Sequence, residues 1–372
     1  MKKVKLVDIC KIQYGFAFDS SLFSNSNNGM PLIRIRDVVR GFTDTYTSES
    51  FIEDYVVNKG DLLIGMDGEF NIAEWQSEKA LLNQRVCKLI PSSTVGKRYI
   101  YYSLIKILKQ IEEKTAFVTV KHLSAKELNK VEILLPSLEE QKEIAEKLDK
   151  VSDLIEKRKQ QLKKLDELVK SRFIEMFGEL DLSAQKSDWE RLSELGTIYT
   201  GTTPSTSDES NWEGDILWIT PAEMNEESFF ISDTVRKITE KGAKSKSLTQ
   251  MPIGTVLLST RAPIGKVGIV AKPMTCNQGF KNFYCPDKLN SIYLYVLLKH
   301  NTQYLNSIGT GTTFKEISKT TCGDIRIPVP AMDKQNEFAE FVKLIDKSKF
   351  EIQKSLEKLE ILKKSLMQQY FG

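Results

Sequence analysis

The residues best suited to chemistry in this chain are basic side chains in short apolar runs and loops. Arg34 and Arg36 alternate with Ile33 and Ile35. On a β-strand, this alternation sends both guanidinium groups to one face and both isoleucines towards the core. Arginine can bond a guanine edge in bidentate fashion or hold a phosphate, so the pair predicts nucleic-acid contact of either kind. The alternative is a solvated polar face.

A second candidate lies in a loop at residues 261–268, with the sequence RAPIGKVG. In a loop rich in glycine and proline, the basic side chains of Arg261 and Lys266 can approach DNA closely. Thr202 and Thr203 stand in the turn sequence GTTP. Their hydroxyl groups either donate to a phosphate or simply form the turn.

Two lysines occupy equivalent turns. Lys121 and Lys315 each follow a threonine by two residues, Thr119 and Thr313. A lysine in such a turn suits phosphate anchoring, because phosphate contacts position a protein on DNA without reading its sequence. The predicted DNA-binding residues are Arg34, Arg36, Lys121, Thr202, Thr203, Arg261, Lys266, Thr313 and Lys315.

The motifs of catalysis are missing. The chain has two histidines, His122 and His300, each isolated in the sequence and expected to be structural. Gly265-Lys266 lacks the upstream glycine of a phosphate loop, and Val267 stands where that loop needs serine or threonine. No glycine-rich turn opens a helix in a βαβ unit, and no cluster has metal-ligand spacing. We therefore expect no catalytic residue, metal or cofactor on this chain.

Length and composition set the remaining bounds. A chain of 372 residues is long enough for two or three domains. The net charge is only +3, so nucleic-acid binding depends on local patches. No apolar run approaches the roughly 18 residues of a membrane span, and Lys5 and Asp8 interrupt the start of any signal sequence. Five cysteines without a CxxC motif indicate a reduced, cytoplasmic protein.

The element that organises the chain is a predicted helix at Leu138–Gly178. Its apolar residues follow nearly alternating four-three spacing, which is typical of a coiled-coil seam. Ser137 and Glu140 form a capping box, and Gly178 suits the left-handed residue that ends a helix. Arg158 interrupts the seam, where it could fix the register or reach a partner subunit. The seam residues are Ile144, Leu148, Val151, Ile155, Leu162, Leu165, Val169 and Phe173.

The last stretch of the chain, Met332–Gly372, repeats this helix at one constant spacing. Gln141 matches Gln335 and Phe177-Gly178 matches Phe371-Gly372, each pair 194 residues apart. A constant offset over a whole helix indicates duplication. The two seams are expected to cover each other as an antiparallel pair.

The segments before the two helices are also copies. Leu6–Gly15 matches Leu192–Gly201 at an offset of 186, and Asn83-Gln84 matches Asn277-Gln278 at 194. Apolar runs predict strands at Leu32–Ile35, Asp61–Ile64 and Val131–Leu135, and a helix at Arg98–Glu113. The expected fold is α+β, with domain 1 at residues 1–137, a helix at 138–182, domain 2 at 183–331 and a second helix at 332–372.

The two copies differ in the segments between their shared positions. Arg34–Arg36 stands opposite Thr220–Ala222, and Met66–Glu69 stands opposite Thr260–Pro263. The shared positions are mostly apolar residues, glycines and prolines, which suit a common scaffold. A common scaffold with different loops predicts two related but different recognition surfaces.

This pattern resembles the specificity (S) subunit of Type I restriction–modification systems over the whole chain. The resemblance rests on the PSLEEQ and PAMDKQ entries to the two helices, the GTTP turn, LWIT at Leu217–Thr220, the RAPIGKVG loop and the paired Asn-Gln motifs. Domain 1 departs from it, with Gln13–Phe16 in place of the turn. Its Asp67–Asn71 loop also lacks the basic character of the loop in domain 2.

The resemblance implies a DNA reader without catalytic activity. Each domain, a target recognition domain in that family, would contact one half of a bipartite, asymmetric target, and the helix pair would set the gap. The expected partners are double-stranded DNA, two methyltransferase (M) subunits and restriction (R) subunits, with S-adenosylmethionine, ATP and magnesium held by those subunits. The rival hypothesis is a coiled-coil scaffold whose globular domains bind proteins.

Overall fold

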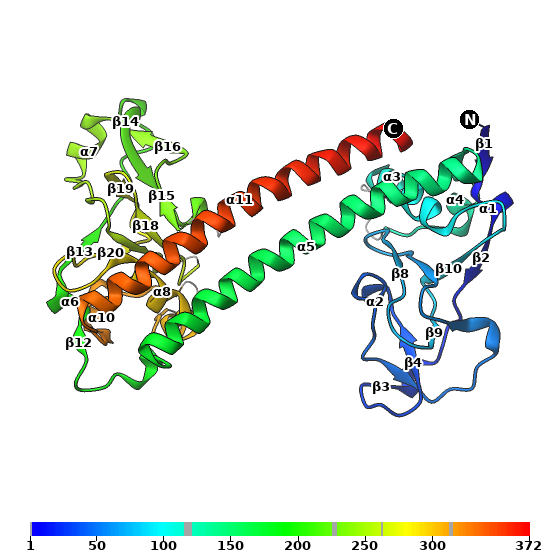
Figure 1. The fold of residues 1–372 in the computed structure, drawn as a ribbon, viewed down its shortest axis with the longest axis horizontal. Helices are drawn as coiled ribbons and strands as arrows, with labels where there is room; N and C mark the ends of the chain where they lie inside the picture. The colour runs from blue at the N-terminus through cyan, green and yellow to red at the C-terminus, as the bar shows by residue number, and fades with distance from the viewer. Residues whose placement is uncertain (1, 115–120, 225–228, 262, 312–314) are drawn as a thin grey trace. The chain divides into compact units, whose positions relative to one another are not determined.

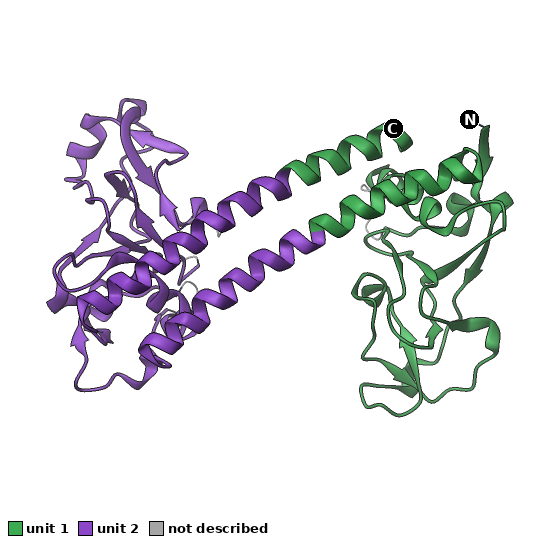
Figure 2. Ribbon diagram, in the orientation of Figure 1, with its two compact units in different colours: residues 1–155, 358–372 green, residues 156–357 purple. Residues whose placement is uncertain are grey.

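The computed structural model describes residues 2–114, 121–224, 229–261, 263–311 and 315–372. The chain divides into two compact units, of which unit 1 comprises Met1–Ile155 with Lys358–Gly372 and unit 2 comprises Glu156–Glu357. Figure 2 shows that each unit contains a piece of both long helices. Each mixed domain therefore belongs to a unit that includes parts of helices from both halves of the sequence.

Unit 1 is built on two sheets and a short strand pair (Figure 1). One sheet has the strand order β2-β10-β7-β8, the other has the order β3-β5-β4-β9-β6, and β1 pairs with β11. Helix α3 (Lys97–Lys114) contributes Tyr99, Ile100 and Leu104 to the core beside the first sheet. The strands are β1 (Lys2–Lys5), β2 (Cys10–Tyr14), β3 (Phe23–Ser24), β4 (Met30–Ile33), β5 (Tyr46–Thr47), β6 (Val56–Val57), β7 (Leu62–Gly65), β8 (Ile72–Glu74), β9 (Ala80–Leu82), β10 (Val86–Pro91) and β11 (Glu132–Leu135); the short helices are α1 (Leu6–Ile9), α2 (Ile35–Arg40) and α4 (Ala125–Leu128).

Unit 2 has a similar plan. One sheet has the order β13-β20-β17-β18-β15, a second has the order β16-β14-β19, and β12 pairs with β21. Helix α8 (Ser291–His300) supplies a nearly continuous buried surface. The strands are β12 (Glu190–Arg191), β13 (Thr197–Thr200), β14 (Trp212–Ile219), β15 (Phe230–Ile231), β16 (Arg236–Ile238), β17 (Val256–Leu258), β18 (Val267–Val270), β19 (Met274–Cys276), β20 (Lys281–Tyr284) and β21 (Arg326–Ile327); the other short helices are α6 (Leu192–Leu195), α7 (Glu240–Ser245), α9 (Thr302–Ser307) and α10 (Lys319–Asp324).

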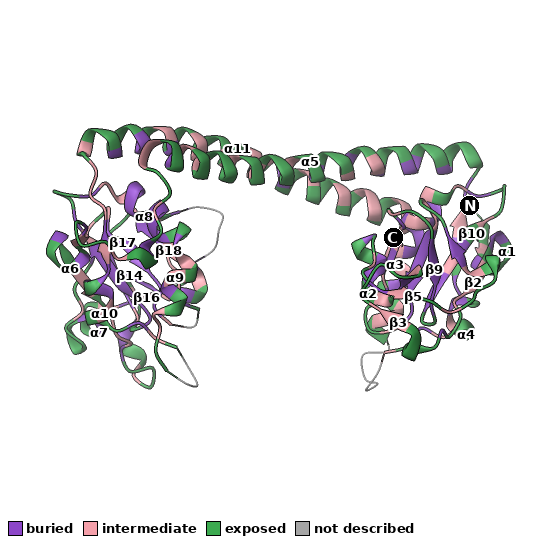
Figure 3. Cartoon of the chain, turned by 90° about the horizontal axis from the view of Figure 1, so that it is seen from below, coloured by how far each residue is buried: buried purple, intermediate pink, exposed green. Residues whose placement is uncertain are grey.

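The two domains share strand order and register. The order β2-β10-β7-β8 in domain 1 corresponds to β13-β20-β17-β18 in domain 2. Cys87 pairs with Tyr14 as Lys281 pairs with Thr200, which are the positions matched by the two offsets. The parallel contact of β4 with β9 likewise recurs between β14 and β19. The duplication predicted from sequence spacing is therefore also present in the hydrogen bonding of the strands. In both units the buried residues gather in the sheets (Figure 3).

The predicted strand at Leu32–Ile35 ends earlier than the alternation suggested. Strand β4 stops at Ile33, Arg34 precedes helix α2, and Arg36 lies in the first turn of that helix. The buried carboxylate of Asp37 accepts the backbone N–H of Arg34 at 2.9 Å, which starts a helix instead of continuing the strand. The prediction that Arg34 and Arg36 share one face of a strand is wrong. The other predicted elements, β7, β11 and α3, are confirmed with small changes at their ends.

The two long helices have the bounds that the sequence predicted. Helix α5 is Leu138–Phe177 and helix α11 is Met332–Phe371. At the start of α5, the Glu140 carboxylate accepts the backbone N–H of Ser137 at 2.9 Å, and Ser137 Oγ accepts from the Glu140 N–H. At its end, Gly178 has φ +82°. Of the predicted seam, the buried residues are Ile144, Leu148, Val151, Ile155 and Phe173, and the half-buried ones are Leu162, Leu165 and Val169.

A buried glutamine holds each domain to the start of the helix that follows it. Gln141 Oε1 accepts the Gly96 N–H at 2.9 Å, and its amide donates to the Pro136 carbonyl at 3.0 Å. Gln335 makes the equivalent bonds, accepting from the Asn290 N–H and donating to the Pro330 carbonyl, both at 2.8 Å. The glutamine in each PSLEEQ or PAMDKQ motif thus has a structural role, since it hydrogen-bonds backbone groups that would otherwise lack partners.

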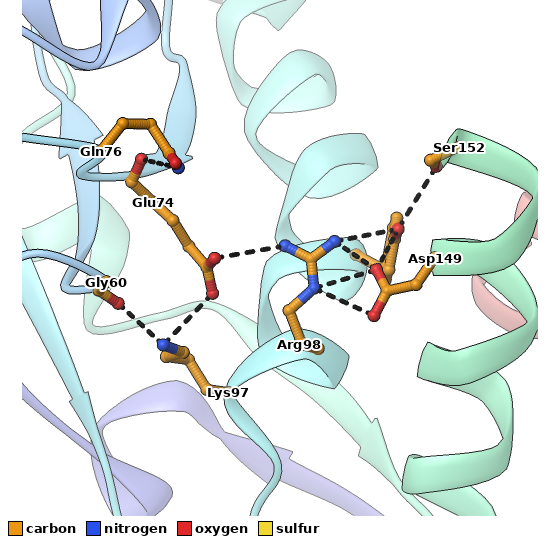
Figure 4. A network of polar contacts seen from close by, with 8 residues as sticks. Gly60, Glu74, Gln76, Lys97, Arg98, Asp149 and Ser152 are labelled. Carbon is orange, nitrogen blue, oxygen red and sulfur yellow. Dashed lines mark hydrogen bonds and ion pairs between the residues drawn. The ribbon is translucent and has the colours of Figure 1, made fainter. Parts of the chain in front are cut away.

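Unit 1 has a further polar network around Arg98, which Figure 4 shows. Arg98 on α3 donates from Nε to the two Asp149 carboxylate oxygens at 2.9 and 3.2 Å, while Tyr102 donates to Asp149 at 2.7 Å. On its other side Arg98 faces Glu74, which also pairs with Lys97. The positions of Arg98 and Asp149 are occupied by Ile292 and Lys343 in the second copy.

The helices of the described part of the chain include none that is long and apolar enough to cross a membrane.

Candidate nucleic-acid interface

In domain 2, the predicted residue Arg261 lies beside a second basic residue and a carboxylate. Its backbone forms an isolated bridge with Glu316, and its guanidinium lies 3.9 Å from that carboxylate. Lys281, on strand β20, reaches the same carboxylate at 3.3 Å and donates to the buried Thr260 hydroxyl. The side chains of Arg261 and Glu316 are 35% and 42% exposed, whereas that of Lys281 is 9% exposed. The pair of Arg261 and Glu316 is therefore accessible to solvent, and the Glu316 carboxylate contacts the buried ammonium group of Lys281.

The GTTP turn lies against the Asn277-Gln278 motif. Thr203 donates from its hydroxyl to Gln278 Oε1 at 2.7 Å, and the Thr202 carbonyl accepts the Trp218 indole N–H at 3.1 Å. Next along the chain, the Gly279 carbonyl accepts the Thr260 N–H at 2.8 Å. This contact joins the turn to the loop that carries Arg261. The Thr203 hydroxyl thus has a protein acceptor and stays only half-buried.

Lys266 has internal partners. Its ammonium group donates to the carbonyls of Pro221 and Met224, at 2.9 and 2.8 Å. These carbonyls belong to the short 3-10 helix Pro221–Glu223 and the residue that follows it. The lysine therefore satisfies the end of that helix. The geometry favours a structural role, although contact with DNA was predicted for it from sequence.

The remaining predicted residues of domain 2 are Lys315 and Thr313. Lys315 is exposed and directly precedes Glu316. It therefore lies beside Arg261 in the fold, through the bridge between residues 261 and 316. Thr313, like Thr119 of domain 1, lies outside the described residues.

Domain 1 has a charged cluster at the matching place. His122 Nδ1 lies 2.5 Å from an Asp67 carboxylate oxygen and 3.2 Å from a guanidinium nitrogen of Arg85. Arg85 Nε lies 3.5 Å from the other Asp67 oxygen. The side chains of Arg85 and His122 are 50% and 40% exposed, whereas that of Asp67 is 23% exposed. A carboxylate here supports an exposed guanidinium, which donates hydrogen bonds, and an exposed imidazole.

Lys121, the neighbour of His122, is engaged by a carboxylate from α3. Its ammonium group donates to Glu112 at 2.9 Å, and the second Glu112 oxygen accepts the Phe70 N–H at 3.2 Å. The hydrogen bond from Lys121 is the largest effect that lowers the pKa of Glu112. This ion pair offsets the charge that Lys121 would offer to a phosphate. Arg34 and Arg36 are exposed elsewhere in domain 1, at the start of α2.

The two clusters stand on one backbone frame. In domain 1, the Met66 N–H donates to the Arg85 carbonyl and the Met66 carbonyl accepts the Leu123 N–H. In domain 2, the Thr260 N–H donates to the Gly279 carbonyl and the Thr260 carbonyl accepts the Ile317 N–H. Every atom pair matches at an offset of 194. The isolated bridges follow the same rule, between residues 67 and 122 and between residues 261 and 316.

These clusters offer hydrogen-bond donors and acceptors but no metal site. Among the residues whose placement is described, no group of three or more histidine, cysteine or acidic residues could hold a metal ion. The five cysteines are all buried and free, at positions 10, 87, 276, 285 and 322.

Comparison with known proteins identifies the family. A model of the Type I restriction modification DNA specificity domain matches residues 1–165 and, separately, residues 186–363. The chain belongs to this family. The two matched ranges are the two halves of the duplication, so each half is one member domain.

Curated members of the DNA specificity family match in part or over most of the chain. The specificity subunit of the Type I restriction enzyme EcoBI from Escherichia coli is 45% identical over 169 residues, covering 45% of this chain and 36% of its own length. The MjaIX specificity subunit from Methanocaldococcus jannaschii is 41% identical over 184 residues, covering 48% and 43%. The alignments thus span less than half of these two relatives. A putative MjaX specificity subunit of the same organism is 24% identical, covering 91% and 85%.

Solved structures of S subunits share the fold. The S subunit of a Type I restriction–modification system from M. genitalium aligns with a TM-score of 0.62 at 16% identity, covering 100% of this chain and 96% of its own. A chain from a structural study of assembly and conformational transition in a Type I system aligns with a TM-score of 0.55 at 17% identity, covering 100% and 97%. At these identities the likeness concerns the fold alone.

Sequence reasoning overlooked five residues of the clusters in this specificity-family chain: Asp67, Arg85, His122, Lys281 and Glu316. In the sequence, His122 is isolated, which favours a structural role, and the Asp67–Asn71 loop is distinguished only by its lack of basic residues. The signal was nevertheless available, because the offset of 194 places Asp67 on Arg261 and His122 on Glu316. What spacing could not supply was that residues 67 and 122 form a bridge.

Proposed function

We propose that this chain is the sequence-specific DNA-recognition subunit of a Type I restriction–modification complex. Each domain would read one half of a bipartite, asymmetric target. Membership of the DNA specificity family supports DNA recognition in general. The observation that carries the bipartite reading is the repeated backbone frame with unlike side chains, since two halves built alike but charged differently suit two different half-sites.

The candidate contacts in domain 2 are Arg261, Lys315, Thr202 and Thr203. Arginine bonds guanine edges, and lysine and hydroxyl groups hold phosphates. In domain 1, Arg34, Arg36 and Lys121 remain candidates for phosphate contact. Lys266 is proposed with a structural role, because its ammonium group already donates to two carbonyls. Thr313 remains a candidate from sequence.

We propose further that α5 and α11 form an antiparallel pair that fixes the gap between half-sites. Within unit 2, Asp166 on α5 accepts from Lys349 at 2.8 Å and Arg172 donates to Glu337 at 2.9 Å. The α11 residue number falls as the α5 number rises, as an antiparallel pair requires. Within unit 1, the end of α11 packs on the core that includes Ile144. Fluorophores that report Ile144 close to Phe338 would contradict this arrangement.

The helices would also dock M subunits, to which R subunits would be added. In this scheme catalysis, S-adenosylmethionine, ATP and magnesium belong to those partners, and this chain selects the site. Arg158 is a candidate contact for a partner: it is half-buried on α5 and donates to the nearby Gln161 at 2.8 Å.

Binding and selection experiments test the proposal. The full chain is mixed with random-sequence duplex DNA at low and moderate salt, then used to select targets from a library with two randomised blocks. We expect salt-sensitive binding, because displaced counterions favour dissociation as salt rises. We also expect a selected target with two unlike blocks at a fixed gap. A scaffold that binds only proteins would show neither result.

A further inference from the structure

The bridge that carries Asp67 in domain 1 and Arg261 in domain 2 keeps its backbone pairing and exchanges an acidic residue for a basic one. In domain 1, the second residue after strand β7 is the acidic Asp67, and its partner on the bridge is His122. In domain 2, the matching residue is the cation Arg261 and its partner is the anion Glu316. The surrounding backbone hydrogen bonds match pair by pair. The backbone pairing is thus kept, while the side chains that it presents differ between the two domains.

In each cluster, a more deeply buried charge supports exposed groups. Asp67, 23% exposed, lies between Arg85 and His122, which are 50% and 40% exposed. Lys281, 9% exposed, lies against Glu316, which is 42% exposed. Domain 1 therefore presents the Arg85 guanidinium, a donor, beside an imidazole, whereas domain 2 presents a donor, Arg261, beside an acceptor, Glu316.

The backbone at Arg85 adds an independent observation. Its φ is +69°, a left-handed conformation that is uncommon for residues other than glycine. The matching residue in domain 2 is Gly279, whose φ is not positive. Strained conformations of this kind cluster at binding sites. An arginine held in this conformation beside Asp67 indicates a use for its side chain beyond stability.

From these observations we infer which residues set the sequence preference of each half-site, an inference that rests on the proposed function. The exposed groups contact base edges, and the deeper charges beneath them are positioning residues. The base-contacting residues are Arg85 and His122 in domain 1 and Arg261 and Glu316 in domain 2; the positioning residues are Asp67 and Lys281.

The chemistry assigns different bases to the two clusters. The major-groove edge of guanine presents two acceptors, which suit the Arg85 and Arg261 guanidinium groups. A carboxylate accepts from the amino group of cytosine. Glu316 beside Arg261 therefore matches neighbouring cytosine and guanine edges. In the domain 1 cluster the carboxylate is the least exposed group, and the Arg85 guanidinium favours bases that present acceptors.

The test compares targets selected from a two-block duplex library by the full chain and its variants. Arg85→Gly removes the guanidinium and replaces it with the residue type found at the matching position of domain 2. Glu316→Gln keeps the size of the side chain and replaces an acceptor-only group with an amide. We expect each variant to relax or change preference at one or two positions of a single block, by roughly tenfold to a hundredfold in relative affinity, and to leave the other block unchanged.

Folding is controlled within the same set. Glycine suits a positive φ, so Arg85→Gly should keep the thermal midpoint of the wild-type chain. Exchanging another exposed ion pair in each domain, Glu53 with Lys79 and Glu240 with Lys244, provides matched charge reversals outside the clusters. These controls should select the wild-type target.

Asp67 is tested through Arg85. If Asp67 positions the guanidinium, Asp67→Asn should reduce base preference in the same block as Arg85→Gly. In the double variant, Asp67→Asn should add little further loss at the base pairs that Arg85→Gly already affects. A purely structural role would instead lower the thermal midpoint in both backgrounds without altering the selected bases.

The outcomes separate this inference from the proposed function. Wild-type chain that selects no DNA target would overturn both. Wild-type selection of two blocks, with the same target and affinity in Arg85→Gly and Glu316→Gln, would overturn the inference alone. Affinity that falls equally for all sequences would also overturn it, because that is the behaviour of a phosphate contact.

Discussion

At the scale of single residues, Lys266 shows how a basic loop side chain can serve the fold. The sequence places it in a glycine- and proline-containing loop, a setting that suited DNA contact. In the structure its half-buried ammonium group donates to two carbonyls at the end of a short helix. Contacts of this kind join residues more than 40 positions apart and cannot be read from spacing. The ammonium group of Lys266 is therefore hydrogen-bonded to acceptors within domain 2.

Replacing Lys266 should destabilise domain 2. Lys266→Met keeps the aliphatic stem and leaves both carbonyls without their charged donor, which should cost about 1.5–3 kcal/mol of unfolding free energy. Urea unfolding at neutral pH would measure the loss. DNA affinity, once corrected for the folded fraction, should remain close to that of the wild-type chain. Unchanged stability with weaker DNA binding would instead favour the contact predicted from sequence.

The site was predictable only in part, for reasons visible at particular residues. Arg261 stood out because it is basic in a distinctive loop. Asp67 and His122 did not, because neither acidic residues nor a lone histidine signal nucleic-acid binding. Their significance depends on a backbone bridge between positions 55 residues apart. The exchange of charge at matching positions is the one part of that pattern which the duplication alone could have revealed.

At the scale of elements, prediction succeeded where local chemistry fixes an end. Ser137, Glu140 and Gly178 mark the limits of α5, and each performs the predicted role. It failed at Ile35, where alternation favoured a strand but Asp37 provides a helix cap. The second copy carried the relevant signal, since Glu223 at the position matching Asp37 accepts from the Thr220 N–H and hydroxyl. A capping residue three positions on outweighs a short alternating run.

The contact of α3 with α5 should depend on acid pH through Asp149. Burial alone would raise the pKa of this carboxyl, but hydrogen bonds from Arg98 and Tyr102 outweigh it and lower the pKa below its usual value. A lowered folded-state pKa contributes stability above the unfolded pKa of about 3.9 and loses it as pH falls through the folded value. Asp149→Asn should therefore reduce stability at pH 7 by about 1–2 kcal/mol.

The pH dependence provides the check on Asp149. Urea midpoints at pH 7, 5 and 3.5 should fall more steeply for the wild-type chain than for Asp149→Asn, so the two should converge in acid. Glu143→Gln, on the same helix and part of an exposed pair with Lys147, is a matched control that should follow the wild-type curve. Parallel curves for Asp149→Asn and the wild type would exclude the ion pair as a source of stability.

His300 should make the stability of domain 2 depend on pH, in a less acidic range than the one in which Asp149 acts. Burial is the main cause that lowers its pKa from 6.5 to about 4, with contributions from Lys170 and Lys299. The unfolded histidine takes up a proton near pH 6.5 and the folded one does not. Stability is therefore lost as pH falls from about 6.5 towards 4. The ring is partly exposed, so solvent screening limits the effect to on the order of 1 kcal/mol.

The measurement for His300 is the slope of stability between pH 7 and pH 5. His300→Gln should flatten that slope, whatever it does to stability at pH 7 through lost contact with Phe173. The neighbouring Asp346 titrates in the opposite sense, because burial raises its pKa. Asp346→Asn should consequently steepen the same slope. An unchanged slope in His300→Gln would show that the folded ring takes up its proton normally.

At the scale of the whole molecule, each unit is completed by a helix end from the other half of the duplication. In unit 1, the ring centroid of Phe371, at the end of α11, lies 5.4 Å from that of Tyr99. In unit 2, the ring centroid of Phe177, at the end of α5, lies 4.9 Å from that of Tyr293. Phe177 matches Phe371 and Tyr99 matches Tyr293 at the offset of 194. The halves are therefore built to exchange equivalent helix ends.

This exchange predicts the behaviour of a fragment of residues 1–182. The fragment keeps domain 1 and α5 but loses Leu366, Met367, Tyr370 and Phe371, which pack on the domain 1 core. A second copy can supply Arg172, Phe173, Met176 and Phe177 at those positions. Three of the four matching side chains are apolar, and each fully buried one contributes about 1.5–3 kcal/mol. Arg172 pairs with Glu337 in the full chain and would meet its counterpart, Glu143, in the dimer.

We therefore expect the fragment to form a two-fold dimer in which Phe177 of each copy covers Tyr99 of the other. Its selected DNA target should contain the domain 1 half-site twice, as an inverted repeat with a similar gap. Light scattering after size exclusion would give the mass, and Phe177→Ala should weaken the dimer more than Leu154→Ala, a change at an exposed helix residue. A fragment that remains monomeric at micromolar concentration, or a dimer that selects the asymmetric target, would show that the two halves are not interchangeable.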